Sequence, residues 1–572
     1  MHKNTDLLTP EGEALAGQPW NVYPRPQMER ESFFCLNGAW KFATVKEGKA
    51  LPSASASAEE IFASRQTTDR IQVPFPPESL LSGIHQAFSV DTVICYQKSF
   101  LCPLKKENGR ILLHFGAVDR NASVYLNGVC LGAHSGGYSP FSFDVTQVLR
   151  EGENLLTVTV TDTQDDKSAL YGKQRKRRGG MWYTPVSGIW QTVWMERVPS
   201  EYIRSLSVTA TASAAEISVT GASAGEVILH LPSGDASFPL ENGRARIEVE
   251  DPILWSPDQP HLYRFTVHAG EDSVRSYFAL REIRIAQING TPRILLNGQP
   301  YFFKGLLDQG YYSDGIFTPA SPACFEKDIQ AAKKLGFNTL RKHIKTEPAL
   351  FYYACDRLGM IVFQDMVSGG SYSFLRDTAL PTLGFQKRND KRMNRNVAYR
   401  SRFLREMEET VARLAFHPCI CYWTIFNEGW GQFESDAAYD RLKSLDDTRP
   451  IDTASGWFRP KKTDVESLHI YFRKPKIKKS TRPILITELG GFVWRAEGHC
   501  FSPRRSYGYG KFSSAAEFAN AYHRLWTEDV EPLIEQGLCG AIYTQLSDVE
   551  DETNGLLTYD RRVCKLTDKA EP

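Results

Sequence analysis

The chain has 572 residues, which is too long for a single hydrophobic core and predicts two to four domains. Its 42% hydrophobic and 24% charged residues are typical of a soluble globular protein, and its formal net charge of +1 excludes a global field that would recruit nucleic acid or an acidic membrane. The 11 cysteines show no zinc-type spacing and no stretch approaches a membrane span, so we expect a cytoplasmic protein with free thiols.

Residues 1–198 read as one short strand after another, separated by Gly, Pro and Asn. The segments GRILLHFGAVDRNASVYLNGVCLGAH and NLLTVTVTD alternate apolar and polar residues, and LNG is a hairpin turn signal. Helical periodicity is nearly absent, so we expect a jelly-roll β-sandwich. The basic run KQRKRR at 173–178 is expected to be a solvated loop.

Residues 199–280 predict a second, smaller β unit. AEISVTG, GEVILHL, ARIEVE and HLYRFTVHAG are its candidate strands. Short strands at this spacing are typical of an immunoglobulin-like β-sandwich.

Residues 281–572 alternate strands with helices. Helices are expected at 322–335, 347–358, 396–416, 434–446 and 513–536. The strand-like runs before, between and after these helices number eight, which predicts a (β/α)8 TIM barrel. The connection GWFRPKKTD after the fifth strand is too short for a normal helix, and a doubly wound sheet is the alternative fold.

Two carboxylates follow buried strands of this predicted barrel. Glu428 ends the strand in CYWTIFNEGWGQF, and Glu488 ends the strand in RPILITELGG. The C-terminal ends of the strands form the active face of a barrel, where these two residues would lie on opposite sides of the ring. Glycoside hydrolases use such a pair of carboxyl groups: one protonates the leaving oxygen and the other attacks the anomeric carbon.

Other strand ends supply polar groups, and tryptophans could stack against a sugar ring. Each is individually more typical of a structural residue, but together they predict a polar pocket. The predicted substrate-binding residues are Asp308, His343, Asp365, Asn427, Trp430, His469, Tyr471 and Trp526. No His/Asp/Glu cluster has metal-ligand spacing, so neither a metal ion nor a cofactor is expected.

Long collinear segments of the chain resemble glycoside hydrolase family 2, which contains β-galactosidases, β-glucuronidases and β-mannosidases. VDRNASVYLNGVCLGAHSGGYSPFSFDVT and SGIWQTVWME are similar to the family's sugar-binding jelly roll, and LWSPDQPHLYRFTV resembles its immunoglobulin-like domain. GFNTLRKHIKTEPALFYYACDRLGMIVFQDM and FNEGWGQF resemble its barrel. The resemblance covers nearly all of the chain and implies the same three domains.

The resemblance also implies residue roles. Glu428 matches the general acid/base, Glu488 the nucleophile, and Tyr471 the tyrosine that hydrogen-bonds the nucleophile. Asn427 would bind the sugar 2-hydroxyl, and the reaction would retain anomeric configuration. The segment DETNGLLTYDRRVCK lacks the Asn-x-Lys motif of the family's glucuronidases, which counts against a glucuronide.

An exo-acting, retaining β-galactosidase is therefore the expected function, with a glycoside or oligosaccharide as partner and neither nucleic acid nor membrane. Specificity for β-galactofuranosides, α-L-arabinofuranosides, β-glucuronides or β-mannosides stays open, and so does a homo-oligomer. The basic loop at 367–400 leaves an acidic glycan open, although a solvated loop is the favoured interpretation. A non-catalytic carbohydrate-binding protein and a metal-dependent hydrolase are the rival classes.

Overall fold

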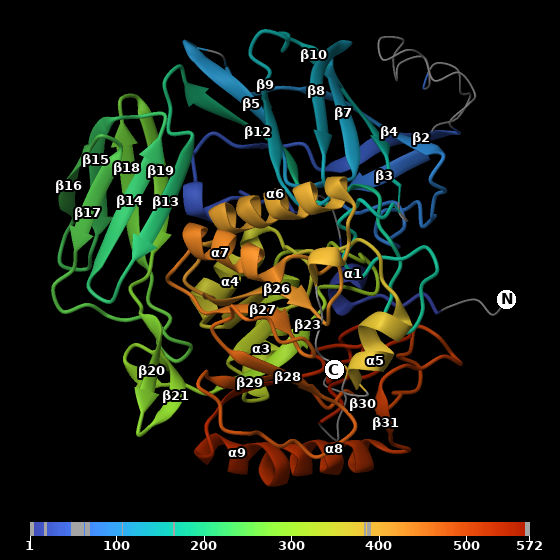
Figure 1. Cartoon of the computed structure of the whole chain (residues 1–572). Helices are drawn as coiled ribbons and strands as arrows, with labels where there is room; N and C mark the ends of the chain where they lie inside the picture. Colours follow the sequence, from blue (N-terminus) through green and yellow to red (C-terminus); the bar gives the residue numbers. More distant parts are fainter. Residues whose placement is uncertain are drawn as a thin grey trace.

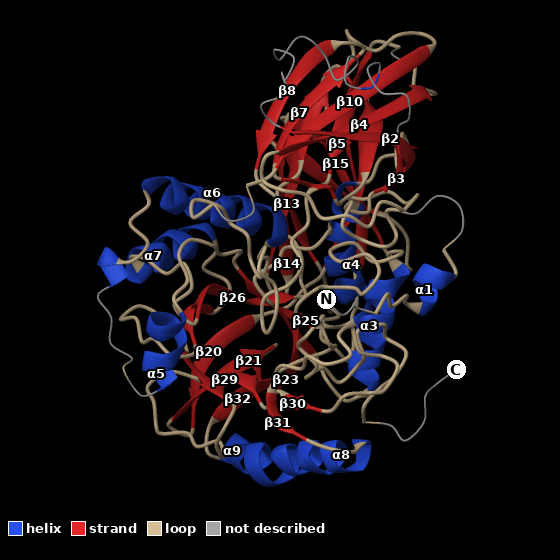
Figure 2. Ribbon diagram, turned by 90° about the vertical axis from the view of Figure 1, so that its right-hand side faces the viewer, coloured by secondary structure: helices blue, strands red, loops and turns tan. Residues whose placement is uncertain are grey.

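The computed structural model describes residues 5–15, 20–46, 62, 69–105, 107–163, 166–382, 385 and 390–566. Figure 1 shows three units: a β-sandwich at the top, a second β-sandwich at the left, and a barrel with its helices below them. In Figure 2 the first sandwich stands above the barrel, and α8 and α9 lie along the opposite side. None of the described helices has the length and apolar character needed to cross a bilayer.

The first unit is a sandwich of two main antiparallel sheets. One sheet has the order β1-β12-β5-β9 and the other the order β3-β2-β4-β10-β7-β8, while β6 pairs with β11. Inward-facing side chains of both sheets, such as Val124 on β7 and Met195 on β12, fill the core between them. The strands are β1 (Phe34–Cys35), β2 (Gly38–Lys46), β3 (Asp69–Val73), β4 (Thr92–Leu101), β5 (Gly109–Phe115), β6 (Val118–Asp119), β7 (Asn121–Leu126), β8 (Val129–Ser135), β9 (Phe141–Asp144), β10 (Glu153–Thr161), β11 (Gly188–Ile189) and β12 (Val193–Pro199). Two short helices, α1 (Pro10–Glu13) and η1 (Pro26–Met28), precede them.

The second unit is the predicted immunoglobulin-like sandwich. Its strands follow the order β13-β14-β17-β16-β15-β18-β19, and β16 joins β17 through the single pair Glu241 and Arg244. The sheet therefore bends there into two facing layers. Its strands are β13 (Ser205–Ala210), β14 (Ala214–Thr220), β15 (Ala224–His230), β16 (Ala236–Glu241), β17 (Arg244–Glu248), β18 (Tyr263–Ala269) and β19 (Asp272–Phe278). We propose that the first domain ends near residue 198, at the end of β12, and that the second ends near residue 280, between β19 and the next strand.

A small antiparallel sheet that the sequence did not predict precedes the barrel. It consists of β20 (Ile283–Ile288), β21 (Thr291–Leu296) and β22 (Gln299–Pro300). Arg293 on β21 donates hydrogen bonds to the carbonyls of Ile534, in the last helix, and Leu538, the first residue of the last barrel strand. The sheet thus packs against the N-terminal end of the barrel, away from its active face.

The barrel has eight parallel strands, as predicted, in the order β27-β26-β25-β24-β23-β32-β29-β28. No ladder of backbone hydrogen bonds joins the described strands β27 and β28. Side chains link them instead: Ser467 donates to Asp452 at 3.0 Å, and Ser455 Oγ lies 3.2 Å from His469 Nε2. The strands are β23 (Phe303–Asp308), β24 (Thr339–Lys342), β25 (Ile361–Asp365), β26 (Ile420–Asn427), β27 (Ile451–Ser455), β28 (Glu466–Ile470), β29 (Ile484–Leu489) and β32 (Leu538–Tyr543).

The predicted barrel helices form within about two residues of their expected bounds, except that 513–536 is divided into three segments. Asn396 and Ser514 cap the starts of α6 and α8, accepting hydrogen bonds from the backbone nitrogens of Tyr399 and Glu517. No helix follows β27 among residues 456–465, as expected from the short connection. The segments are α3 (Ala323–Lys334), α4 (Ala349–Leu358), α6 (Val397–Leu414), α7 (Ser435–Leu445), α8 (Ala515–Arg524), the π-helix η4 (Leu525–Val530) and α9 (Glu531–Glu535), with η2 (Leu375–Ala379), α5 (Leu380–Thr382), η3 (Asp390–Arg392), β30 (Phe492–Val493) and β31 (Tyr509–Lys511) in the loops.

One segment of the first unit, residues 171–183, lies on the C-terminal end of the barrel. Gly172 donates its backbone N–H to the carbonyl of Ser368, 2.9 Å away, and Tyr171 donates its hydroxyl to the carbonyl of Gly370 at 2.6 Å. We call residues 171–183 the docking segment. Because it reaches the loop after β25, the first unit contributes directly to the face that carries Glu428 and Glu488.

Candidate active site

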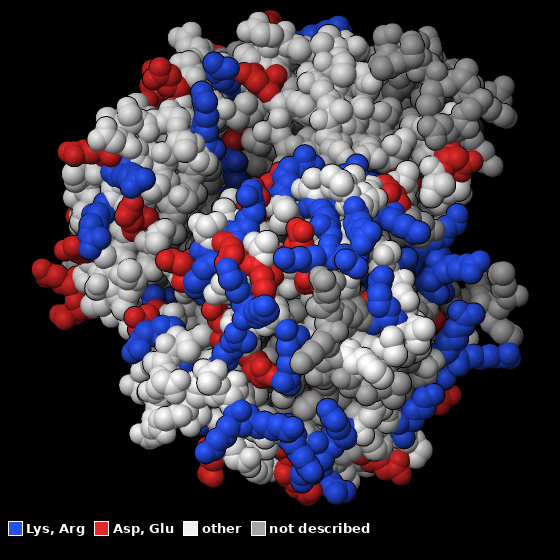
Figure 3. Space-filling model, in the orientation of Figure 1, with Lys and Arg blue, Asp and Glu red and all other residues white. Residues whose placement is uncertain are grey.

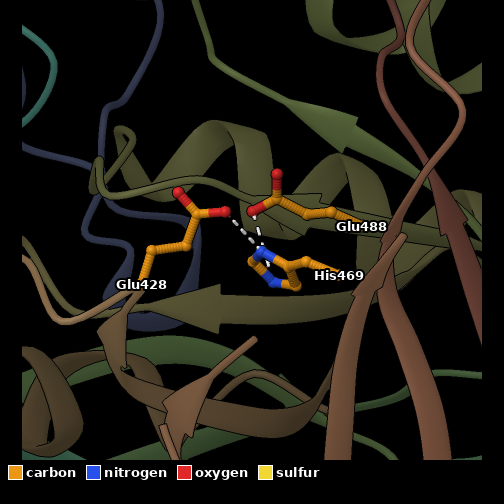
Figure 4. Close-up of side chains that lie close together, drawn as sticks. All are labelled: Glu428, His469 and Glu488. Carbon is orange, nitrogen blue, oxygen red and sulfur yellow. Dashed lines mark hydrogen bonds and ion pairs between the residues drawn. The ribbon is translucent and has the colours of Figure 1, made fainter. Parts of the chain in front are cut away.

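Two carboxylates meet at the C-terminal end of the barrel. Glu428 follows β26 directly, and Glu488 lies near the end of β29. An oxygen of each carboxylate lies within 4.8 Å of the other and of a ring nitrogen of His469. Figure 4 shows the three side chains pointing toward one another, with His469 reaching both glutamates. Parallel strands bring these residues, 60 positions apart in sequence, onto one face.

Glu428 is held by contacts that converge on one of its oxygens. His469 Nδ1 lies 2.7 Å from Glu428 Oε1, Trp457 Nε1 donates to the same atom at 2.6 Å, and the Tyr471 hydroxyl lies 3.4 Å away. Among the described residues, none donates a hydrogen bond to Oε2. The backbone of Glu428 has a φ of 49°, in the left-handed region that is unusual for a glutamate. The side chain is therefore fixed through one oxygen, while the other is free to exchange a proton.

Glu488 lies in a strongly cationic environment. Arg341 Nη1 donates to Oε1 at 3.0 Å, Tyr471 donates its hydroxyl to Oε2, and His469 Nε2 is 3.6 Å from Oε1. Burial raises the pKa of this carboxyl, but His469, Arg341 and His343 outweigh burial and, with the Tyr471 hydrogen bond, lower the pKa to about 2. Glu488 is consequently ionised at neutral pH.

Arg341 on β24 connects the two sides of the site, and sequence reasoning missed it. Its side chain is fully buried and donates to Asp365, Asn427 and Glu488 at distances between 2.8 and 3.0 Å. A guanidinium has several donors in a fixed plane, so one residue can orient three partners. The segment NTLRKH has only one large apolar residue, so its sequence predicts a strand but gives no sign that Arg341 is buried.

Arg341 also fixes the amide of Asn427. Because arginine can only donate, the Asn427 oxygen faces it, at 2.8 Å from Nη2. The amide nitrogen of Asn427 then points elsewhere and has no hydrogen-bond acceptor among the described residues. It is thus a donor available beside Glu428.

His343 and Asp365 form a second pair within the same network. His343 Nδ1 lies 2.8 Å from Asp365 Oδ2, and both side chains are buried. Burial raises the pKa of Asp365, but Arg341 and His343 lower it below its ordinary value; burial lowers the pKa of His343. The pair braces the ends of β24 and β25 beside Arg341.

Asp308 lies apart from the Arg341 network. It forms an ion pair with Lys342, and its other oxygen accepts the backbone N–H of Gly310 at 2.8 Å. Lys342 also pairs with Glu347 at 3.0 Å. These contacts brace the end of β23, and a role for Asp308 in substrate binding stays a prediction.

Trp430 forms the boundary between the barrel and the docking segment. Its ring stacks on Trp182 with centroids 5.1 Å apart, and the Lys173 ammonium lies 4.7 Å from its centroid. The residue is only 3% exposed. One face of the predicted stacking platform is therefore already covered by protein.

The assignment of Trp526 to the pocket was wrong. Trp526 lies in the π-helix η4 on the outside of the barrel, where it packs against Phe337 and Tyr522. Lys304 Nζ, on the outward side of β23, lies 4.8 Å from its ring. Its burial in the layer between helix and barrel explains why a large aromatic residue is found there.

Comparison with known proteins agrees with these three units. Residues 33–199 match the model described as glycosyl hydrolases family 2, sugar binding domain; residues 198–281 match glycosyl hydrolases family 2; and residues 288–562 match glycosyl hydrolases family 2, TIM barrel domain. A β-galactosidase of Thermoanaerobacter pseudethanolicus is 26% identical over 354 residues, covering 58% of this chain but only 44% of its own length. A β-glucuronidase of Paenibacillus borealis is 26% identical over 484 residues, covering 78% of this chain and 76% of its own.

The fold is also that of a solved relative. The structure of Bifidobacterium dentium β-glucuronidase complexed with coumarin-3-O-glucuronide superposes with a TM-score of 0.73 at 20% identity, covering 96% of this chain and 97% of that one. All three family models match in the order of the three structural units. The chain therefore belongs to glycoside hydrolase family 2.

Proposed function

We propose that this protein is a retaining exo-glycosidase of the β-galactosidase type, which cleaves an O-glycosidic bond through a covalent glycosyl-enzyme. The observation that carries the proposal is the close approach of the two carboxylates, within 4.8 Å between their nearest oxygens. Retention requires carboxyl groups about 5–5.5 Å apart, whereas inversion needs roughly 6.5–9.5 Å to admit a water molecule.

Glu488 is the proposed nucleophile. Its pKa of about 2 keeps it ionised, which attack on the anomeric carbon requires. Tyr471 and Arg341 hold its two oxygens, so the carboxylate is oriented before substrate arrives. As the ester forms, the negative charge leaves Glu488 and those two hydrogen bonds weaken.

Glu428 is the proposed general acid, then general base. The anchored Oε1 leaves Oε2 to give a proton to the departing oxygen and later to take one from water. Asn427, whose amide nitrogen is turned away from Arg341, would donate to the sugar 2-hydroxyl, a contact that strengthens in the transition state.

The loop after β32 favours a neutral sugar in the pocket. Glu552 lies where the Asn-x-Lys motif is missing; it accepts hydrogen bonds from Tyr183 and, at 3.2 Å, from Asn554. Burial raises the pKa of Glu552, against the influence of Lys173. A carboxyl group at this position offers an acceptor to a sugar hydroxyl, and in its ionised form, which Lys173 favours, it would repel a uronate; both effects support a galactoside over a glucuronide.

A panel of nitrophenyl glycosides tests both class and specificity. The panel comprises the β-galactoside, β-galactofuranoside, α-L-arabinofuranoside, β-glucuronide and β-mannoside, each assayed with and without EDTA. Turnover of the β-galactoside that survives EDTA is the expected result. Exclusive turnover of another member would replace the sugar assignment, and binding without turnover would point to a carbohydrate-binding protein.

The stereochemistry of the first product tests the mechanism. Proton NMR should show the released sugar first with the anomeric configuration of the substrate. If the opposite anomer forms first, Glu488 is not a nucleophile and the double displacement is wrong.

A further inference from the structure

The basic run at 173–178 does not lie on an unrelated surface but at the mouth of the proposed active site. Arg175 stacks over Trp182 with its guanidinium carbon 4.5 Å from the ring centroid, and Trp182 stacks on Trp430. Arg178 pairs with Glu550, which follows β32, at 3.1 Å. The run therefore extends along the mouth from the end of β26 to the end of β32.

Lys173 is the innermost cation of this run. The residue is 7% exposed, and its ammonium lies over the rings of Trp430 and Tyr183, at 4.7 and 5.8 Å from their centroids. Among the described residues, no carboxylate oxygen lies within 4.0 Å of the Lys173 ammonium, the limit for an ion pair. A nearly buried ammonium without such a partner is costly for stability, which is typical of a group kept for a ligand.

The charge of Lys173 acts on both walls of the mouth. It opposes the burial that raises the pKa of Glu552, and it adds to the burial that lowers the pKa of His343. Both partners belong to loops and strands at the C-terminal face of the barrel. The ammonium therefore contributes to the electrostatics of the pocket itself.

Exposed cations also lie in neighbouring loops, and Arg178 and Arg505 both approach Asp551 at 3.8 Å. Lys176 and Arg177 are exposed, as are Arg473 and Lys474 after Tyr471 and Arg504 and Arg505 beside Tyr507. Arg505 and Lys474 have acidic neighbours, Asp551 at 3.8 Å and Asp529 at 2.8 Å. Lys and Arg side chains crowd the right-hand part of the face in Figure 3, where α5 and β31 lie in Figure 1. This local excess contrasts with a net charge of +1 for the whole chain.

Aromatic side chains lie between these cations. Tyr372 meets Trp182 edge-on at 5.2 Å, and Phe472, 72% exposed, meets Tyr509 at 4.8 Å. Rings beside a cleft offer apolar surfaces to sugar rings, and guanidinium groups match the planar geometry of carboxylates. The mouth thus offers aromatic surfaces for sugar rings and cationic groups for carboxylates, and a charged saccharide has both features.

We propose that the run 173–178, with Arg473, Arg504 and Arg505, forms a cationic subsite for the part of the substrate beyond the cleaved bond. The preferred substrate is then a neutral sugar linked to an anionic aglycone or oligosaccharide that carries carboxylate or sulfate groups. The inference rests on the proposed glycosidase function and adds the chemical class of the leaving portion. It also assigns a specificity role to the first domain.

Three aryl glycosides of the sugar preferred in the panel test this subsite. Their phenyl rings carry a 3-carboxylate, a 3-sulfonate or, as the neutral counterpart of the carboxylate, a 3-carboxamide. At low ionic strength we expect kcat/KM of the anionic glycosides to exceed that of the amide about tenfold, within the range of electrostatic focusing in a charged cleft. The advantage should disappear in high salt, where the screening length falls to about 3 Å at 1 M.

Paired variants separate the subsite from general charge. Lys176→Gln/Arg177→Gln should reduce the anionic-to-neutral ratio of kcat/KM, and so should Lys173→Met, which keeps an apolar stem against Trp430. Arg244→Gln/Arg246→Gln is the matched control, because both arginines are exposed on β17 of the second unit. The control should leave the ratio unchanged.

The outcomes distinguish the subsite from the function on which it rests. If the amide is cleaved and the anionic glycosides have no advantage, the proposed subsite is wrong but the proposed glycosidase function is retained. The same conclusion follows if the control lowers the ratio as much as the Lys176→Gln/Arg177→Gln variant does. An advantage for the carboxylate alone, or for the sulfonate alone, identifies the anion that the site takes. If no glycoside is cleaved, the proposed function itself is wrong.

Discussion

Replacement of Arg341 by methionine tests the electrostatic design of the site. The change removes a buried cation that donates to Asp365, Asn427 and Glu488 at 2.8–3.0 Å. Methionine keeps an unbranched apolar stem and has no charge, so Glu488 and Asp365 would lose a shared partner. Loss of one member of a buried ion pair costs about 3–5 kcal/mol, which we expect as a lower free energy of unfolding in urea.

The same variant should change the pH dependence of catalysis. The pKa of Glu488 is about 2, so the wild-type acid limb lies below the pH range in which enzymes are usually assayed. An opposite charge within about 4–6 Å lowers a carboxyl pKa by roughly 1–3 units. Without Arg341 the acid limb of kcat/KM should therefore rise by about 1–3 pH units, into an accessible range.

The sign of the stability change follows from the same shift. A carboxyl with a depressed folded-state pKa stabilises the protein above its unfolded-state pKa of 4.5, and this contribution is lost as the pH falls toward 2. Arg341→Met should remove part of the contribution at neutral pH, whereas Arg341→Lys, which keeps the charge, should show a smaller shift of the acid limb. An unchanged acid limb in the methionine variant would refute the role assigned to Arg341.

Four further outcomes are expected. Glu488→Gln should abolish labelling by a fluorosugar that marks the wild-type residue, as detected by peptide mass spectrometry; labelling at another residue contradicts the nucleophile assignment. Glu428→Ala should impair glycosides with poor leaving groups far more than activated aryl glycosides and should yield a β-glycosyl azide when azide is added; equal losses on both substrates argue against an acid/base role. Tyr471→Phe should lower kcat about 10- to 100-fold, because a hydrogen bond to a charged group contributes about 1.5–3 kcal/mol; a normal kcat would show that this bond does not orient the nucleophile. Trp526→Ala should cost about 3–5 kcal/mol of unfolding free energy while kcat/KM per folded molecule stays constant, and a raised KM would return this residue to the pocket.

The sequence predicted the layers of the barrel because their signals are local. The helix α6 has a 3.6-residue apolar pattern with an Asn396 cap, and β26 is a continuous apolar run that ends in Asn427 and Glu428. These features depend on neighbours in the chain. The sheet β20–β22 also has a local signal, because Asn289-Gly290 and Asn297-Gly298 form hairpin turns between its strands, but we interpreted this stretch as the beginning of the barrel.

The site was only partly predictable, because its connections are made across the fold. Periodicity indicated that Arg341 lies in a strand but not that its side chain points into the barrel. For Trp526, no sequence pattern distinguishes a ring in the helix layer from one at the pocket. The partners of both residues lie far away in sequence, so the assignments require the three-dimensional arrangement.

The docking segment shows a different limit. A run such as KQRKRR is usually solvated, and that expectation is correct for Lys176 and Arg177 but wrong for the buried Lys173. Burial of Lys173 depends on Trp430, which belongs to another domain. Composition within one domain cannot reveal a neighbour supplied by another.

The position of residues 171–183 has an evolutionary consequence. Their contacts with the loop after β25 and with Trp430 make the pocket a joint product of two domains, although both carboxylates come from one. Lys176 and Arg177 in this segment are exposed, and exposed loop positions tolerate substitution better than the strands of a barrel core. New substrate preferences can therefore arise by substitutions at these exposed positions, while Glu428 and Glu488 in the barrel stay unchanged. A recombination that transferred the barrel alone would carry both carboxylates but leave one wall of the pocket behind.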